Sequence, residues 1–164
     1  MKTTVNFMGR HEFIRMIKNQ GEDIDDSFAI ISISDYDTER VDVEVGVKLY
    51  TNCKNAIFLE FKDTEFEDCI SNEQAKNLTD FIIEHEGKNF IVHCWAGVSR
   101  SAAVAKFIDE YYHIRSPALE FYKIYNKRVK SKLDSSCCVM SISDYYEELE
   151  LNERIHNYES KYSN

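Results

Sequence analysis

Short apolar runs of strand length alternate with longer segments of helical period along this chain. The clearest strand-like runs are residues 28–34 and 56–61, which are rich in β-branched and aromatic residues. A short run at residues 5–8 also suits a strand, and the mostly apolar residues 89–93 suit a strand that is buried on both faces. This alternation predicts an α/β domain in which helices pack on a central sheet.

The segments of helical period carry recognisable start and stop signals. Ser71 and Gln74 have the spacing of a capping box, and the helix that they begin should end at Gly87. Pro117 suits a first helical turn that leads into a helix at residues 119–128. Three further segments are expected to be helices: residues 12–18, 101–112 (Ala-rich and buried) and 141–158.

Length and charge narrow the class of protein. The 164 residues suit one domain spanning 1–164, and the 43% of hydrophobic residues can fill its core. A formal net charge of -9 repels nucleic acids and anionic membranes, so neither is an expected partner. No run approaches the ~20 apolar residues of a membrane span, and no signal peptide is evident, so we expect a soluble cytoplasmic protein.

The cysteines also favour a reducing compartment. They are odd in number and irregularly spaced, unlike a disulfide framework or a zinc site with Cys-x-x-Cys pairs. The five are Cys53, Cys69, Cys94, Cys137 and Cys138.

The segment His-Cys-Trp-Ala-Gly-Val-Ser-Arg-Ser at residues 93–101 carries the most chemistry. Cys94 follows a buried strand, and Arg100 stands six positions later where a helix begins. Because Ala96 and Gly97 have little side-chain bulk, the loop can curl so that its backbone N–H groups converge beside the helix N-terminus. Such a nest fits a phosphate dianion.

The same N–H groups and the helix dipole stabilise a negative sulfur, so we expect Cys94 to be a thiolate at neutral pH. Arg100 can present two parallel N–H donors to phosphate oxygens and match the charge that builds as phosphorus is attacked. Lysine would supply the charge without this forked geometry.

Residues 93–101 closely resemble the signature loop of the protein tyrosine phosphatase superfamily, in which a His-Cys pair precedes five residues and Arg-Ser or Arg-Thr. The Ala-Gly-x-Ser-Arg-Ser form is similar to the compact dual-specificity group and its small microbial relatives. The resemblance covers roughly residues 28–130, and it implies a mostly parallel sheet of about four to five strands between helices, with no metal and no cofactor.

The resemblance also implies roles for single residues. Asp63, which follows the run at 56–61, matches the family's general acid, and Asp68 in the same loop is the reserve. Ser101 would hydrogen-bond the sulfur as it leaves, and His93 would orient the cysteine. The expected phosphate-binding residues are Trp95, Ala96, Gly97, Val98, Ser99 and Arg100.

Three functions remain open on the sequence. The leading one is a protein phosphatase that acts on phosphotyrosine, with phosphoserine and phosphothreonine as wider options, through a cysteinyl-phosphate intermediate. A noncatalytic phosphopeptide-binding module would keep the nest but not the chemistry, and a rhodanese-like sulfur transferase would not need Asp63. Trp95 is larger than the residue common at its position, so it either shapes the pocket rim or simply packs.

Overall fold

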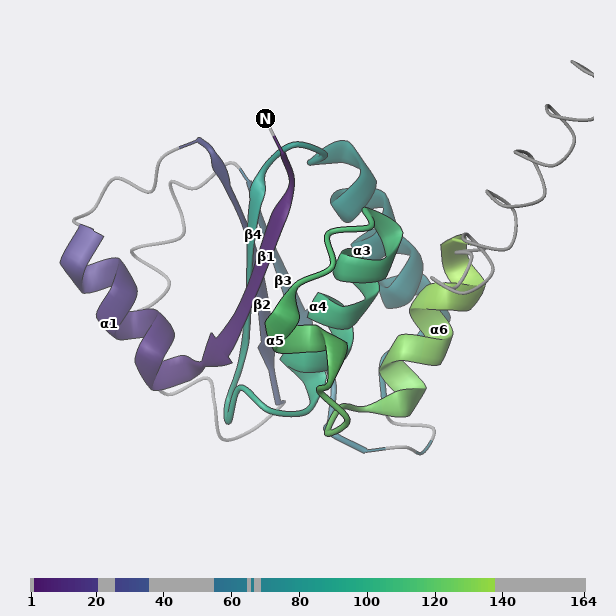
Figure 1. The fold of residues 1–164 in the computed structure, drawn as a ribbon. Coiled ribbons are helices and arrows are strands. Elements are labelled where there is room, and N and C mark those ends of the chain that lie inside the picture. The colour runs from purple at the N-terminus through teal and green to yellow at the C-terminus, as the bar shows by residue number, and fades with distance from the viewer. Residues whose placement is uncertain (1, 21–25, 36–54, 65, 67–68, 138–164) are drawn as a thin grey trace, which may run out of the picture.

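A single parallel sheet organises the described part of the computed structural model, which comprises residues 2–20, 26–35, 55–64, 66 and 69–137 (Figure 1). Its strand order is β1-β4-β2-β3, and all three pairings are parallel. The strands are β1 (Thr4–Gly9), β2 (Phe28–Ser34), β3 (Ala56–Glu60) and β4 (Asn89–Cys94). The predicted α/β class with a parallel central sheet is confirmed, and the carboxyl ends of all four strands meet at one edge.

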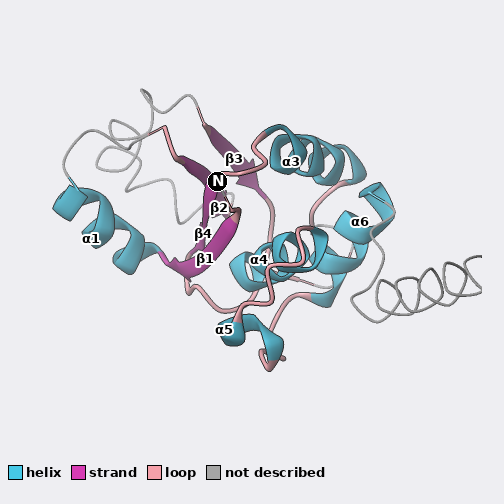
Figure 2. Cartoon of the chain, turned by 45° about the horizontal axis from the view of Figure 1, so that its top comes forward, coloured by secondary structure: helices cyan, strands magenta, loops and turns pink. Residues whose placement is uncertain are grey.

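Helices cover both faces of this sheet. In Figure 2, α1 lies on one side of the strands, and α3, α4 and α6 lie on the other. The helices are α1 (Arg10–Gln20), α3 (Asn72–Glu84), α4 (Arg100–Tyr111), the single turn α5 (Pro117–Glu120) and α6 (Lys127–Cys137). No helix in the described ranges is both long and apolar enough to cross a bilayer.

Each face of the sheet has its own apolar core. On the α1 side, Phe13 and Ile17 pack against Ile30 and Ile91 of the two central strands. The larger core on the other side contains Phe90 and residues of α3, α4 and α6. Because both faces are covered, β4 is buried along most of its length, which explains its nearly continuous apolar sequence.

The capping box that begins α3 is present as predicted. Ser71 Oγ accepts a hydrogen bond from Gln74 N, and Gln74 Oε1 accepts one from Ser71 N. The same Gln74 side chain donates to the carbonyl oxygen of Glu60 at the end of β3, so the cap also ties the helix to the sheet. The helix ends at Glu84, shortly before Gly87, whose φ is +82°.

The predicted helix at 119–128 is wrong. The chain forms only the short α5 turn, and a new helix, α6, begins at Lys127. Asn126 Oδ1 accepts a hydrogen bond from Val129 N and so caps a new helix at this point. Residues 121–125 therefore connect α5 to α6 and belong to neither helix. The helix predicted at 141–158 lies outside the described residues.

Candidate active site

The segment that links β4 to α4 forms a tight loop at the carboxyl edge of the sheet. Cys94 ends β4 and pairs in register with Gly9 at the end of β1. Gly97 lies in the left-handed region with φ of +73°, and a Cβ there would stand 2.1 Å from the backbone nitrogen of Gly9. Only glycine fits this contact, so the loop is seated directly against the end of β1.

The loop carbonyls are held from outside by backbone donors. Arg10 N donates to Trp95 O over 3.2 Å, and Asn126 N donates to Ser99 O, also over 3.2 Å. In a planar trans peptide the C=O and N–H bonds point in opposite directions. Because these two carbonyls point toward Arg10 and Asn126, the N–H groups of Ala96 and Arg100 point away from those donors and into the loop.

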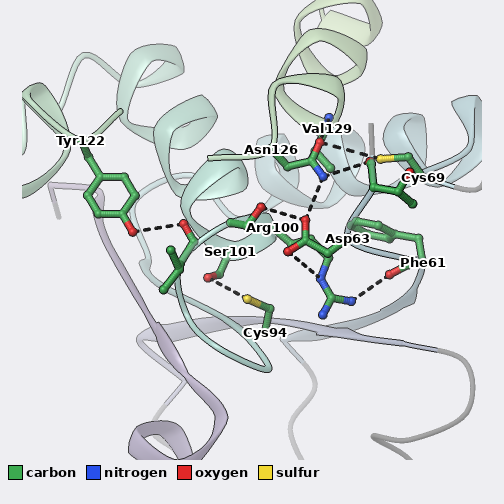
Figure 3. Close-up of polar contacts among 12 residues, drawn as sticks. Phe61, Asp63, Cys69, Cys94, Arg100, Ser101, Tyr122, Asn126 and Val129 are labelled. Carbon is green, nitrogen blue, oxygen red and sulfur yellow. Dashed lines mark hydrogen bonds and ion pairs between the residues drawn. The ribbon is translucent and has the colours of Figure 1, made fainter. Parts of the chain in front are cut away.

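The Cys94 side chain lies at the base of this loop. It is 2% exposed, and its Sγ is 3.2 Å from the hydroxyl oxygen of the fully buried Ser101 in the first turn of α4 (Figure 3). A hydroxyl at this distance can donate a hydrogen bond to a thiolate. The sulfur therefore has a donor in place to stabilise negative charge on it.

The guanidinium of Arg100 is fixed between the loop and the end of β3. Its Nη1 donates to the carbonyl oxygen of Phe61 over 2.8 Å, and the residue is 4% exposed. Its Nε lies 4.0 Å from Oδ2 of Asp63. The arginine charge is thus buried beside the loop in a defined orientation, facing the carboxylate that the sequence suggested as general acid (Figure 3).

Asp63 is held by two donors on a single oxygen. Ser99 Oγ donates to Oδ1 over 2.7 Å, and Asn126 Nδ2 donates to the same oxygen over 2.9 Å. The side chain remains 38% exposed, so the carboxyl group also faces solvent. The structure brings Asp63 together with Arg100 and the loop, whereas the reserve acid Asp68 lies outside the described residues.

His93 is a buried neutral base. It is 7% exposed, and its ring stacks on Phe13 with centroids 4.1 Å apart and planes 11° apart. Burial, and then the nearby charge of Arg10, lowers the pKa of His93 to about 4. It therefore carries no charge near neutral pH and can support Cys94 from the strand without adding positive potential.

Trp95 is the exposed member of the loop. It is 47% exposed, and the guanidinium carbon of Arg10 stands over its ring, 5.2 Å from the centroid. The ring of His11 is tilted toward it at 6.3 Å. The indole is therefore held in place on the loop, beside Cys94, with part of its surface open to solvent.

Among the described residues, the two other cysteines lie outside the loop between β4 and α4. Cys69 is buried, and its Sγ lies 4.0 Å from Oδ1 of Asn126; burial raises the pKa of its thiol. Cys137 ends α6 and is half-buried. Cys69 and Cys137 are both free thiols. Cys53 and Cys138 lie outside the described residues.

The contacts of two residues of this site are missed by reasoning from sequence. The resemblance relates Asn126-Lys127-Arg128 to a segment that packs near the signature loop, but it gives Asn126 no catalytic role. In the structure Asn126 contacts Asp63 and caps α6. An asparagine immediately before a basic helical run is a helix-start signal that is available in the sequence. Tyr122 is expected on a face of the helix predicted at 119–128. In the structure its hydroxyl donates to the carbonyl oxygen of Val98 in the loop, a contact between distant residues that no local sequence pattern predicts.

Within the residues that the structure describes, no group of three or more His, Cys, Asp or Glu side chains is arranged to hold a metal ion.

No family model and no curated protein sequence matches this chain. Among solved structures, the chain is similar to the Cydia pomonella PTP-2 phosphatase, with 17% identity and a TM-score of 0.47 over 88% of this chain and 82% of that one. It is also similar to Tk-PTP in its active form, with 16% identity and a TM-score of 0.43, and to a mutant form of Tk-PTP, with 18% identity and a TM-score of 0.39; both similarities cover 94% of this chain and 92% of the other.

Proposed function

We propose that this chain is a cysteine-dependent phosphatase that hydrolyses phosphotyrosine in proteins, with phosphoserine and phosphothreonine as further substrates. The observation that carries the proposal is the convergence of three side chains from separate segments. Cys94 ends β4, Arg100 begins α4, and Asp63 follows β3, 4.0 Å from the arginine. Thiolate, phosphate-binding arginine and proton donor are the three groups that such a hydrolysis needs.

In the first step the Cys94 thiolate attacks phosphorus in line with the leaving oxygen. The S–P bond forms as the P–O bond to the leaving group breaks, and Asp63 gives its proton to the departing oxygen. Arg100 and the inward N–H groups of the loop stabilise the charge on the three remaining phosphate oxygens. The product is a cysteinyl phosphate and a free phenol or alcohol.

In the second step water attacks the cysteinyl phosphate. Asp63, now a carboxylate, takes a proton from the water, the new P–O bond forms and the S–P bond breaks. Ser101, 3.2 Å from the sulfur, donates a hydrogen bond to the thiolate as it leaves. Inorganic phosphate departs, and Asp63 is protonated again for the next cycle.

The loop composition favours a protein substrate over a phosphoinositide. A phosphoinositide carries extra phosphates, and lysines within the loop would be expected to meet them. The loop residues here are Trp95, Ala96, Gly97, Val98 and Ser99, none of them basic. The half-exposed indole of Trp95 also offers an apolar edge to an aromatic leaving group.

We also propose that residues 1–164 act as one phosphatase domain in the cytoplasm. The thiols of Cys69, Cys94 and Cys137 are free, which supports a compartment where cysteines stay reduced.

Hydrolysis of para-nitrophenyl phosphate tests the proposal directly. Wild type and Cys94→Ser are assayed between pH 5 and 8 in the presence of a chelator, with circular dichroism to match their folding. We expect turnover in the wild type and its loss in the variant, because serine is not ionised at these pH values. A folded wild type without turnover would refute the phosphatase and favour the binding module or the sulfur transferase.

A further inference from the structure

Tyr122 reaches the phosphate loop from the segment between α5 and α6. Its hydroxyl donates to the carbonyl oxygen of Val98 over 3.1 Å. Its half-buried ring is fixed edge-on against Phe7 near the end of β1, with centroids 5.1 Å apart. In Figure 3 Tyr122 approaches the loop from the side opposite to Asp63 and Arg100. The phenol therefore braces the loop at the Val98 carbonyl, whereas Asp63 contacts the loop at the Ser99 hydroxyl.

The brace acts on one particular peptide. When the Val98 carbonyl is held outward, the N–H of Ser99 in the same trans peptide must point the other way, into the loop. Arg10 N and Asn126 N impose the same orientation on the peptides that follow Trp95 and Ser99. Tyr122 is a third donor to a loop carbonyl, beside Arg10 N and Asn126 N. It differs from them because a side-chain donor can be removed by substitution, whereas a backbone donor cannot.

The phenol stays protonated while it does so. Burial, and then the negative charge of Cys94, raises the pKa of Tyr122 above the usual value for tyrosine. The hydroxyl therefore remains a donor throughout the pH range in which a cysteine phosphatase would be assayed.

We propose that Tyr122 is a positioning residue of the phosphate loop, which holds the Val98–Ser99 peptide so that the Ser99 N–H faces a bound oxyanion. The proposal rests on the proposed function, because it assumes that the loop binds the phosphate of a substrate. In this role Tyr122 acts through the Val98–Ser99 peptide and contacts no substrate atom. Its contribution is to keep one donor of the nest aligned before the anion arrives.

The test removes one oxygen atom, by Tyr122→Phe in the Cys94→Ser background, and measures the binding of inorganic phosphate and of tungstate by calorimetry. The ring and its packing on Phe7 are kept. Because a single intramolecular hydrogen bond is worth about 1 kcal/mol, we expect both oxyanions to bind about fivefold more weakly. In the Cys94-containing enzyme, the inhibition constant of phosphate should rise by the same factor.

Tyr112→Phe is the matched control. Its phenol also donates to a backbone carbonyl oxygen, that of Ile82 over 2.6 Å, but this bond joins the end of α4 to α3 away from the loop. We expect this variant to lower the melting temperature and to leave oxyanion affinity unchanged. Weaker binding in Tyr122→Phe alone supports the proposal.

Two results would overturn the inference, and they differ in what they say about the proposed function. Equal oxyanion affinity in Tyr122→Phe and its parent would remove the positioning role and leave the phosphatase proposal standing. No oxyanion binding in the folded parent would remove both, because the loop would then not be a phosphate site.

Discussion

The side-chain amide of Asn126 lies 2.9 Å from Oδ1 of Asp63, although the two residues are 63 positions apart. The same Nδ2 lies 3.1 Å from the carbonyl oxygen of Thr64. One amide group therefore donates hydrogen bonds both to the Asp63 carboxyl group and to the neighbouring backbone. Meanwhile Oδ1 of Asn126 caps α6 through Val129 N. The start of α6 thereby holds the candidate general acid, Asp63, against the loop between β4 and α4.

Replacing Asn126 by aspartate should separate its two roles, the capping of α6 and the hydrogen bond to Asp63. Aspartate still caps α6, but it cannot donate to Asp63 and it places a second carboxylate beside the first. We expect kcat to fall about tenfold, a loss of roughly 1.4 kcal/mol, with phenyl phosphate, whose leaving group needs a proton. With para-nitrophenyl phosphate the loss should be smaller, because its leaving group departs as a stable phenolate.

Asn126→Ser is the companion variant, since serine is a neutral cap that lacks the amide donor. It should lower kcat for phenyl phosphate more than for para-nitrophenyl phosphate, while the free energy of unfolding in urea changes by less than about 1 kcal/mol. Equal losses on the two substrates in both variants would mean that Asn126 supports the whole site and not the acid.

The role of Asp63 itself is tested by Asp63→Asn. Asparagine keeps an oxygen for Ser99 and Asn126 but has no carboxyl proton to give. General acid catalysis contributes about 10²–10⁴-fold, so we expect kcat for phenyl phosphate to fall within that range. A Brønsted plot of rate against leaving-group pKa should become steeper.

The same plot discriminates between functions. A sulfur transferase would not need this carboxyl group, so turnover with unchanged leaving-group dependence in Asp63→Asn would speak against the phosphatase mechanism. Recovery of the rate in Asp63→Glu, whose longer side chain keeps the proton, would strengthen it.

Local signals in the sequence are enough for most of the architecture. The runs that form β2, β3 and β4 carry β-branched and aromatic residues, and Ser71 with Gln74 fixes the start of α3 through contacts only three residues apart. These features depend on near neighbours in the chain. Secondary structure of this kind can therefore be read from one sequence.

The candidate site depends on both near and distant neighbours. The loop at 93–101 can be recognised because Cys94, Gly97 and Arg100 are close in sequence. The partners Asn126 and Tyr122 come from the segment around α5, where the helix prediction fails because periodicity does not distinguish the Asn126 cap from a helix interior. Tertiary contacts, not periodicity, decide where those two side chains point.

Gly97 should tolerate no side chain. Alanine would meet a left-handed φ of +73° and would put Cβ 2.1 Å from Gly9 N, an atom of the β1 backbone that cannot yield without moving the strand. The left-handed conformation alone costs about 1–2 kcal/mol. We expect Gly97→Ala to lower the free energy of unfolding by more than this and to abolish measurable oxyanion binding.

Gly87→Ala provides the control for Gly97. Gly87 has a similar φ of +82° but follows α3, at the opposite end of β4 from the loop. The Gly87→Ala variant should lose about 1–2 kcal/mol of stability and keep full turnover. If Gly97→Ala behaved in the same way, the close packing of the loop on β1 would not be required for binding.

His93 should make the fold sensitive to mild acid. Its pKa is about 4 in the folded protein and about 6.5 in the unfolded chain. Between these values the unfolded state binds more protons, so this contribution to stability is complete above pH 6.5 and is lost as pH falls toward 4. At pH 5 the loss should be about 2 kcal/mol relative to pH 7.

Urea unfolding of wild type and His93→Gln at pH 7 and pH 5 measures this contribution. Glutamine does not titrate, so the variant should lose about 2 kcal/mol less than the wild type between the two pH values, whatever its absolute stability. The comparison cancels the titration of carboxyl groups, because these are common to both proteins. If both proteins lost the same stability, His93 would titrate normally in the fold, and its stacking on Phe13 would not exclude the charged form.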